Sequence, residues 1–162
     1  MKLLVAVDGS QASYNAAKKS AEIAKKYGFE VGLLTVVEDD AVSRHLRSEK
    51  LWRQVDGSSI SGRTRTVDDE DVAGGLRENA LQQMDTLTDK LDFKDVKVGK
   101  AVLFGEPYKM ILEAAETEKV DLIVMGNRGY SKAKRFFVGS VTEKVIAEAT
   151  CPVLVIHADQ EE

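Results

Sequence analysis

Cysteine is almost absent from this sequence of 162 residues, because Cys151 is the only one. An internal disulfide is therefore excluded, and without Cys or His partners nearby Cys151 cannot anchor a zinc site, so we interpret it as a buried bystander. No apolar run approaches the roughly 18 residues that a membrane helix needs. The first apolar run ends at Asp8 and is too short for the core of a signal peptide. We therefore expect a cytoplasmic protein without a membrane partner.

The chain has no excess of positive charge, since 27 acidic residues outnumber 23 basic ones, the net charge is −4 and the pI is about 5.3. Broad binding to nucleic acid requires an extended positive face, so we expect no nucleic-acid partner. Against this acidic background, the segment Gly126–Val141 (GNRGYSKAKRFFVGSV) holds three glycines, four cations and no acid. Such a reversal of charge in one loop predicts a local site for an anionic ligand.

Short apolar runs alternate with helical patterns along the chain. The runs that predict strands are Leu3–Val7, Val31–Val37, Val96–Phe104, Asp121–Met125 and Pro152–Ile156. Near-continuous apolar strands separated by helices predict a parallel sheet covered on both faces. We expect an α/β, Rossmann-like, doubly wound domain with five parallel strands in the order 3-2-1-4-5. Lys97, Gly99 and Lys100 interrupt the third run, which therefore fits an edge.

One stretch breaks this alternation. Residues 38–75 form a connection much longer than a compact α/β unit usually needs, so we interpret them as an insertion into a single domain spanning residues 1–162. Leu51, Trp52 and Val55 could form one packed helical turn within it. A solvated loop is favoured over a lid on the ligand, because only some long loops are functional.

The loops after the first and fourth strands should face each other, since ligands bind where the strand order reverses. Gly126 would lie at the mouth of this crevice, where a missing side chain allows close approach to a ligand. Gly139 and Ser140 would begin the next helix, whose first N–H groups favour an anion such as phosphate. Ser140-x-x-Glu143 also reads as a capping box. The alternative is that Ser140 is only a cap and the glycines only connect a strand to a helix.

Two further positions face the crevice from neighbouring strands. Asp8 ends the first strand and could accept a hydrogen bond from a ribose hydroxyl or a base amino group, or could serve the local turn. Val36 ends the second strand and could offer backbone groups to a purine, although most valines at such positions belong to the core. Among the cations of the loop, Arg128 is the first choice for a ligand contact, and Lys132, Lys134 and Arg135 would supply positive potential.

Familiar nucleotide motifs are missing. There is no G-x-x-x-x-G-K-[ST] sequence, which excludes the usual P-loop. The glycines follow the fourth strand rather than the first, which disfavours dinucleotide chemistry. A phosphoacceptor domain would need an aspartate after the third strand, where this chain has Phe104 and Gly105.

The segments LLVAVDGSQAS, DLIVMGNRGYSKAKRFFVGSV and CPVLVI together resemble the universal stress protein family. Gly126, Gly129, Gly139 and Ser140 meet the motif G-x2-G-x9-G-[ST] of its ATP-binding branch. The resemblance implies that Val7 and Asp8 contact adenosine, that Val36 meets adenine through its backbone, and that Met125 and Gly126 border the ribose. It further implies phosphate contacts from Gly129, Gly139, Ser140 and Val141. ATP, with Mg²⁺ or Mn²⁺, would be the ligand, and a homodimer would form through the last strand.

The sequence predicts a protein that binds a nucleotide but has no dedicated catalytic residues. The loop between Gly126 and Ser140 contains no carboxylate that could orient water. We therefore expect an ATP-binding regulatory protein of the stress response, with no catalytic residue and no metal-ligating side-chain set. The alternative is a slow ATP hydrolase or another nucleotide-transforming enzyme, because a bound triphosphate with its metal already has much of its charge stabilised.

Overall fold

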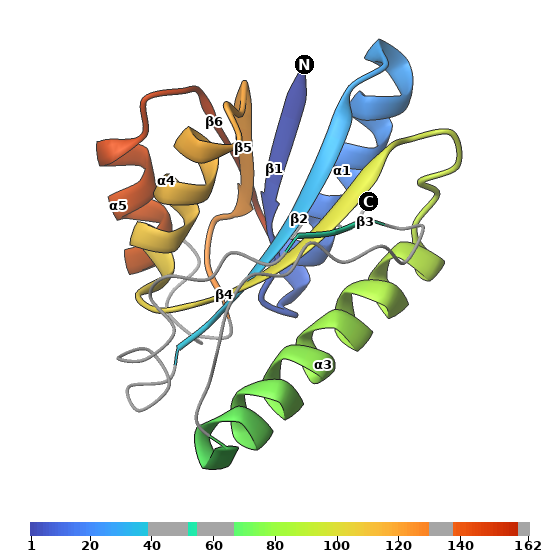
Figure 1. The fold of residues 1–162 in the computed structure, drawn as a ribbon. Coiled ribbons are helices and arrows are strands. Elements are labelled where there is room, and N and C mark those ends of the chain that lie inside the picture. Colours follow the sequence, from blue (N-terminus) through green and yellow to red (C-terminus); the bar gives the residue numbers. More distant parts are fainter. Residues whose placement is uncertain (39–51, 55–66, 130–137, 159–162) are drawn as a thin grey trace.

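A twisted β-sheet forms the centre of the protein in the computed structural model, which describes residues 1–38, 52–54, 67–129 and 138–158 (Figure 1). Its strands are β1 (Lys2–Ala6), β2 (Glu30–Val37), β3 (Trp52–Gln54), β4 (Val98–Phe104), β5 (Leu122–Gly126) and β6 (Val153–Ile156). They lie in the order β3-β4-β2-β1-β5-β6, and only β3 runs antiparallel to its neighbour. The five parallel strands confirm the predicted order 3-2-1-4-5, with β4, β2, β1, β5 and β6 as its members.

The helices cover both faces of the sheet, as a doubly wound fold requires (Figure 1). Helices α1 (Gln11–Tyr27) and α3 (Val67–Lys90) lie on one face, and α4 (Pro107–Thr117) and α5 (Ser140–Glu148) lie on the other. Successive strand residues point to opposite faces, so Leu3 and Val5 enter the α1/α3 core while Leu4 enters the α4/α5 core. The strands are almost continuously apolar because both faces of the sheet are buried.

Helix α1 shows how local sequence sets the position of an element. Ser10 is its N-cap and accepts a hydrogen bond from the Ser13 N–H, while Gly28 ends it in the left-handed conformation at φ 68°. The stripe of buried alanines that faces the sheet consists of Ala12, Ala16, Ala17, Ala21 and Ala24. Small side chains let the helix axis approach the sheet closely, which brings the first turn of α1 against the end of β5.

Strand β4 is the outermost parallel strand, as predicted, but it is not the edge of the sheet. Trp52 pairs with Ala101 in the antiparallel β3, so the expected helical turn around Trp52 is wrong; Leu51 and Val55 lie outside the described residues. Lys100, which the sequence pattern placed at an exposed edge, is buried, and its Nζ donates to Asp85 Oδ1 at 2.6 Å and to Thr88 Oγ1 at 2.9 Å on α3. A buried strand lysine paired with a half-exposed acid on the covering helix cannot be distinguished from an exposed lysine by sequence pattern.

Helix α3 begins inside the stretch interpreted as an insertion, since Val67 to Gly75 are helical. Its later turns bury Ala80, Met84 and Leu87 against the sheet. Although α3 is the longest helix, none of the helices in the described parts of the chain has the length and apolar character to cross a bilayer.

Candidate functional site

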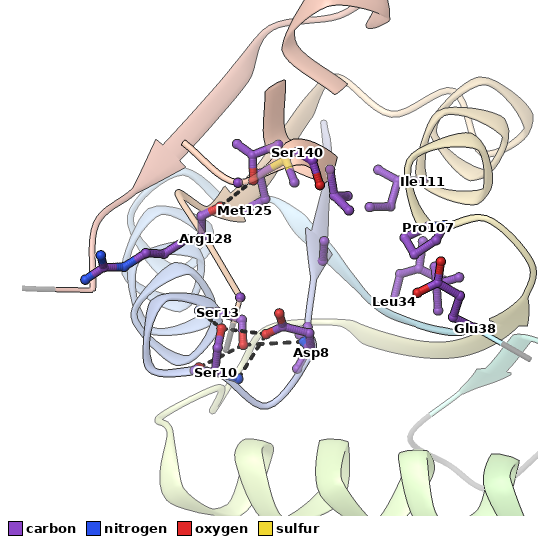
Figure 2. Close-up of a pocket in the computed structure, with 18 residues that line it drawn as sticks. Asp8, Ser10, Ser13, Leu34, Glu38, Pro107, Ile111, Met125, Arg128 and Ser140 are labelled. Carbon is purple, nitrogen blue, oxygen red and sulfur yellow. Dashed lines mark hydrogen bonds between the residues drawn. The ribbon is translucent and has the colours of Figure 1, made fainter. Parts of the chain in front are cut away.

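A pocket of about 400 Å³ opens at the carboxyl ends of β1 and β5, where the strand order reverses (Figure 2). This is the place where open α/β sheets bind their ligands, and the volume lies in the range of about 300–1,000 Å³ that is usual for ligand pockets. All ten site residues predicted from the sequence line it: Val7, Asp8, Val36, Met125, Gly126, Arg128, Gly129, Gly139, Ser140 and Val141. The fold therefore brings together residues that are more than one hundred positions apart. Their contact with a ligand stays a prediction.

One side of the pocket is an apolar wall contributed by β2 and α4. Leu34 and Val36 line it from alternate positions of β2, and Pro107 and Ile111 line it from positions one helical turn apart on α4 (Figure 2). Proline at the start of α4 is favourable because the first helical N–H has no partner in the helix. A flat apolar group such as a base would fit this wall better than a phosphate.

The backbone of Val36 is directed into the same region. The Leu34 carbonyl accepts a hydrogen bond from Val7 N at 2.8 Å on the β1 side, while the Val37 carbonyl accepts from Gly105 N on the β4 side. Because backbone groups alternate sides along a strand, the N–H and C=O of Val36 point to the β1 side. There β1 has already ended at Ala6, so these groups project past the end of their neighbouring strand.

Asp8 organises the turn between β1 and α1. Its Oδ1 accepts hydrogen bonds from Ser10 N at 2.9 Å and from Ser10 Oγ at 2.5 Å, which is an Asx-type turn leading into the N-cap. Ser13 Oγ donates to the Ser10 carbonyl at 2.9 Å and so stiffens the same turn. The other oxygen, Oδ2, lies beside Gly129 in the loop after β5. The local role and a ligand role are thus compatible, because they use different oxygens.

Gly126 is required by packing against α1. A Cβ on this residue would lie 2.6 Å from Ala12 Cβ and 3.0 Å from Ser13 N, which is closer than such atoms approach. The sequence had suggested that the missing side chain faces a ligand. The structure gives it a different reason: the first turn of α1 lies directly on the end of β5, which holds the turn containing Asp8 beside the glycine-rich loop.

Gly129 and Gly139 also lie where neighbouring groups come close to the backbone and leave little room for a side chain. A Cβ on Gly129 would lie 2.6 Å from Asp8 Oδ2, so the absence of a side chain there leaves room for the carboxylate. A Cβ on Gly139 would lie 3.3 Å from the Arg128 Cα, and Gly139 N donates to the Asn127 carbonyl at 2.7 Å. These contacts close the loop between β5 and α5 at its described ends.

Helix α5 begins one residue earlier than a capping box at Ser140 would require. Gly139 is the N-cap and makes no side-chain cap, so the predicted capping box of Ser140 and Glu143 is wrong. Ser140 is instead the first helical residue and is exposed at the pocket. The start of α5 is held by Thr142, a buried residue whose Oγ1 donates to the Gly126 carbonyl at 2.9 Å.

Arg128 lines the pocket mainly through its backbone. Figure 2 shows its guanidinium pointing away from Asp8 and from the apolar wall. The other cations of the loop, Lys132, Lys134 and Arg135, lie outside the described residues. Within the described ranges, no three His, Cys, Asp or Glu side chains gather as a metal site.

Sequence reasoning missed several lining residues. They are Ala6, Ser10, Ser13, Leu34, Glu38, Pro107, Ile111 and Thr142. Strand alternation from Val36 could have found Leu34 and Glu38, and helical spacing could have linked Pro107 with Ile111. That α4 closes the pocket could not be foreseen, because it depends on how the helix packs on the sheet.

This fold and site define the class of protein. It is a doubly wound α/β domain whose ligand crevice lies where the strand order reverses and is bordered by a glycine-rich loop. The chain belongs to the universal stress protein family, since residues 1–157 match the model of that family. This finding confirms the resemblance that the sequence motifs suggested.

Individual relatives agree with this assignment. Universal stress protein MJ0531 of Methanocaldococcus jannaschii is 33% identical over 161 residues, covering 99% of this chain and 84% of the relative. The solved structure of MJ0577 from the same organism superposes with a TM-score of 0.74 at 26% identity, covering 99% of this chain and 97% of that one. A universal stress protein family protein from Arabidopsis thaliana, solved with AMP bound, shares the fold at a TM-score of 0.62 and 19% identity over 99% of this chain and 93% of that one.

Proposed function

We propose that this protein binds ATP in the pocket between β1 and β5 and acts as a nucleotide-dependent regulator in the stress response. The observation that carries the proposal is the division of the pocket into an apolar wall and a glycine-bordered helix start. The base would lie between Val36 and Ile111, and the phosphates would lie at Gly129, Gly139 and Ser140. The AMP-bound structure of the Arabidopsis family member supports an adenine nucleotide as the ligand class.

The phosphate end can hold an anion by backbone groups alone. The first N–H groups of α5 have no intrahelical acceptor, and the helix dipole adds to their attraction for negative charge. A hydrogen bond to a charged acceptor contributes roughly 1.5–3 kcal/mol, so a few of them account for micromolar binding. Ser140 is exposed at the start of α5 and adds a hydroxyl donor.

The divalent ion expected with ATP fits this arrangement through Asp8. Mg²⁺ usually binds to one or two carboxylates together with the phosphates of the nucleotide. Oδ1 of Asp8 is engaged by Ser10, and Oδ2 faces Gly129 at the proposed phosphate end. Asp8 would therefore supply the protein's ligand to Mg²⁺ or Mn²⁺ or, in the absence of the ion, would accept from a ribose hydroxyl.

Isothermal titration calorimetry with ATP and Mg²⁺ tests the proposal. We expect one site per chain, and we expect Val141→Asp, which adds a carboxylate at the phosphate end, to abolish binding. Gln82→Glu is the matched control, because it also adds one negative charge, at an exposed position outside the pocket residues. No heat and no thermal stabilisation at millimolar ATP would refute nucleotide binding. Repeated phosphate release by the purified protein would instead favour the slow ATP hydrolase.

We also propose that the protein pairs with a second copy through β6. The strand is apolar and partly buried at Val153, Leu154 and Val155, and it occupies the end of the described sheet. Such an edge attracts another strand unless it is covered. Light scattering after size-exclusion chromatography should give twice the chain mass, and Val155→Lys should give the monomer. A monomer in the unmodified protein would contradict this pairing.

A further inference from the structure

The pocket-facing side of β2 ends in a carboxylate. Leu34, Val36 and Glu38 occupy alternate positions, and all three line the pocket, so Glu38 continues the wall that the two apolar residues begin. Figure 2 shows its carboxylate beside Pro107, across the pocket from Arg128. An acidic side chain thus stands at the apolar end of the pocket, away from the loop proposed to hold phosphates.

Glu38 differs from the neighbouring acid on α4. Glu106 precedes Pro107 but is engaged by Lys109 at 2.7 Å and by Lys144 at 3.6 Å. The Lys109 hydrogen bond lowers the pKa of Glu106, which keeps that carboxylate charged and paired. Glu38 is exposed and forms no such ion pair with the described residues. Its acceptor oxygens can therefore meet a ligand.

The polar groups at this end of the wall select for one kind of base edge. An ionised carboxylate is only an acceptor, and Val36, whose backbone projects past the end of β1, offers its carbonyl as a second acceptor and its N–H as a donor to the next atom of the base edge. A ligand atom between the two acceptors, the Glu38 carboxylate and the Val36 carbonyl, must therefore donate. An exocyclic amino group has two N–H bonds and can donate to both, whereas a keto oxygen at the same position would face two acceptors and be repelled.

Building on the nucleotide binding proposed above, we infer that Glu38 is a specificity residue that accepts a hydrogen bond from the 6-amino group of a purine nucleotide. Asp8 lies on the opposite side of the pocket and is already engaged by Ser10, so the two carboxylates have separate tasks. The protein should prefer 6-aminopurines over purines with hydrogen or oxygen at that position.

The test compares ATP with purine riboside 5′-triphosphate, which lacks only the 6-amino group. Calorimetry measures both affinities in the unmodified protein, in Glu38→Ala and in the control Glu106→Gln. Removal of a negative charge near the pocket changes the affinity for both triphosphates equally, so the ratio of the two affinities reports only the amino contact. We expect the Glu38→Ala exchange to lower that ratio about tenfold, the effect of one charge-assisted hydrogen bond, and Glu106→Gln to leave it unchanged.

The outcomes separate the inference from the proposal beneath it. If neither triphosphate binds the unmodified protein, nucleotide binding itself is refuted, and the role of Glu38 fails with it. If ATP binds but the affinity ratio is the same in Glu38→Ala as in the unmodified protein, nucleotide binding stands and the role of Glu38 is overturned. If Glu106→Gln lowers the affinity ratio as much as Glu38→Ala does, the role of Glu38 is also overturned, because a general charge effect would then explain the change.

Discussion

Replacement of Gly126 by alanine provides a direct measurement of how tightly α1 packs on β5. The new Cβ would lie 2.6 Å from Ala12 Cβ, 2.9 Å from the Ala12 carbonyl carbon and 3.0 Å from Ser13 N. Two of these atoms belong to the helix backbone, which cannot move aside as a flexible side chain can. Helix and strand must therefore separate by several tenths of an ångström.

The magnitude follows from the general cost of overpacking. Extra methylene groups in a well-packed core cost about 1–3 kcal/mol, and the backbone contacts place Gly126→Ala in the upper part, at about 2–3 kcal/mol. In a chain of this length, each kcal/mol of lost stability lowers the melting temperature by about 2–4 °C, so the melting temperature of Gly126→Ala should fall by about 4–12 °C. Calorimetry or circular dichroism during heating measures this shift.

Gly74→Ala is the matched control for this exchange. Gly74 is exposed in α3, and a Cβ built there would meet nothing within 4 Å. Alanine in a helix is favoured over glycine by about 0.5–1 kcal/mol, so this variant should be slightly stabilised. Equal melting temperatures for Gly126→Ala and the unmodified protein would refute the inferred approach of α1 to β5.

Three further predictions follow from individual contacts. Gly129→Ala should place a Cβ against Asp8 Oδ2, lowering ATP affinity in calorimetry about tenfold with little change in melting temperature, since a carboxylate end can rotate; unchanged affinity would contradict a ligand role for that oxygen. Asp85→Ala should cost about 1 kcal/mol in urea unfolding, because Asp85 is half exposed and the buried Lys100 ammonium keeps Thr88 Oγ1 as an acceptor, whereas Lys100→Met, which removes the buried charge, should cost less; equal losses would speak against this asymmetry. Burial raises the pKa of the Cys151 thiol, so less thiolate forms at pH 8 and alkylation should be slower in the folded protein than in urea; equal rates would disprove the burial effect.

Much of the fold could be predicted because it depends on neighbouring residues. Apolar runs and turn residues located the five parallel strands, and the order 3-2-1-4-5 followed from the general rules for parallel sheets. Polar residues inside a strand were harder to interpret. Lys100 suggested an exposed edge, but it is buried and pairs with the half-exposed Asp85, fifteen positions earlier.

The candidate site shows the same division. The ten residues expected at the site do line one pocket, because strand ends and helix starts are local features that the sheet order brings together. The reasons for individual residues were less predictable. Ser140 was expected to cap α5, yet the chain already enters the helix at Gly139, whose backbone is held by Asn127.

The amino-acid sequence by itself determined the class of fold, the family and the segment at which an anion would be sought, because periodicity, glycine spacing and charge are properties of residues close together in the chain. Only the tertiary structure decided that Gly126 serves the packing of α1, that Gly129 faces Asp8 and that Glu38 completes the wall opposite the glycine-rich loop. These relations join residues far apart in sequence. They arise from the packing of helices on the sheet, where a difference of one methyl group decides whether two segments can meet.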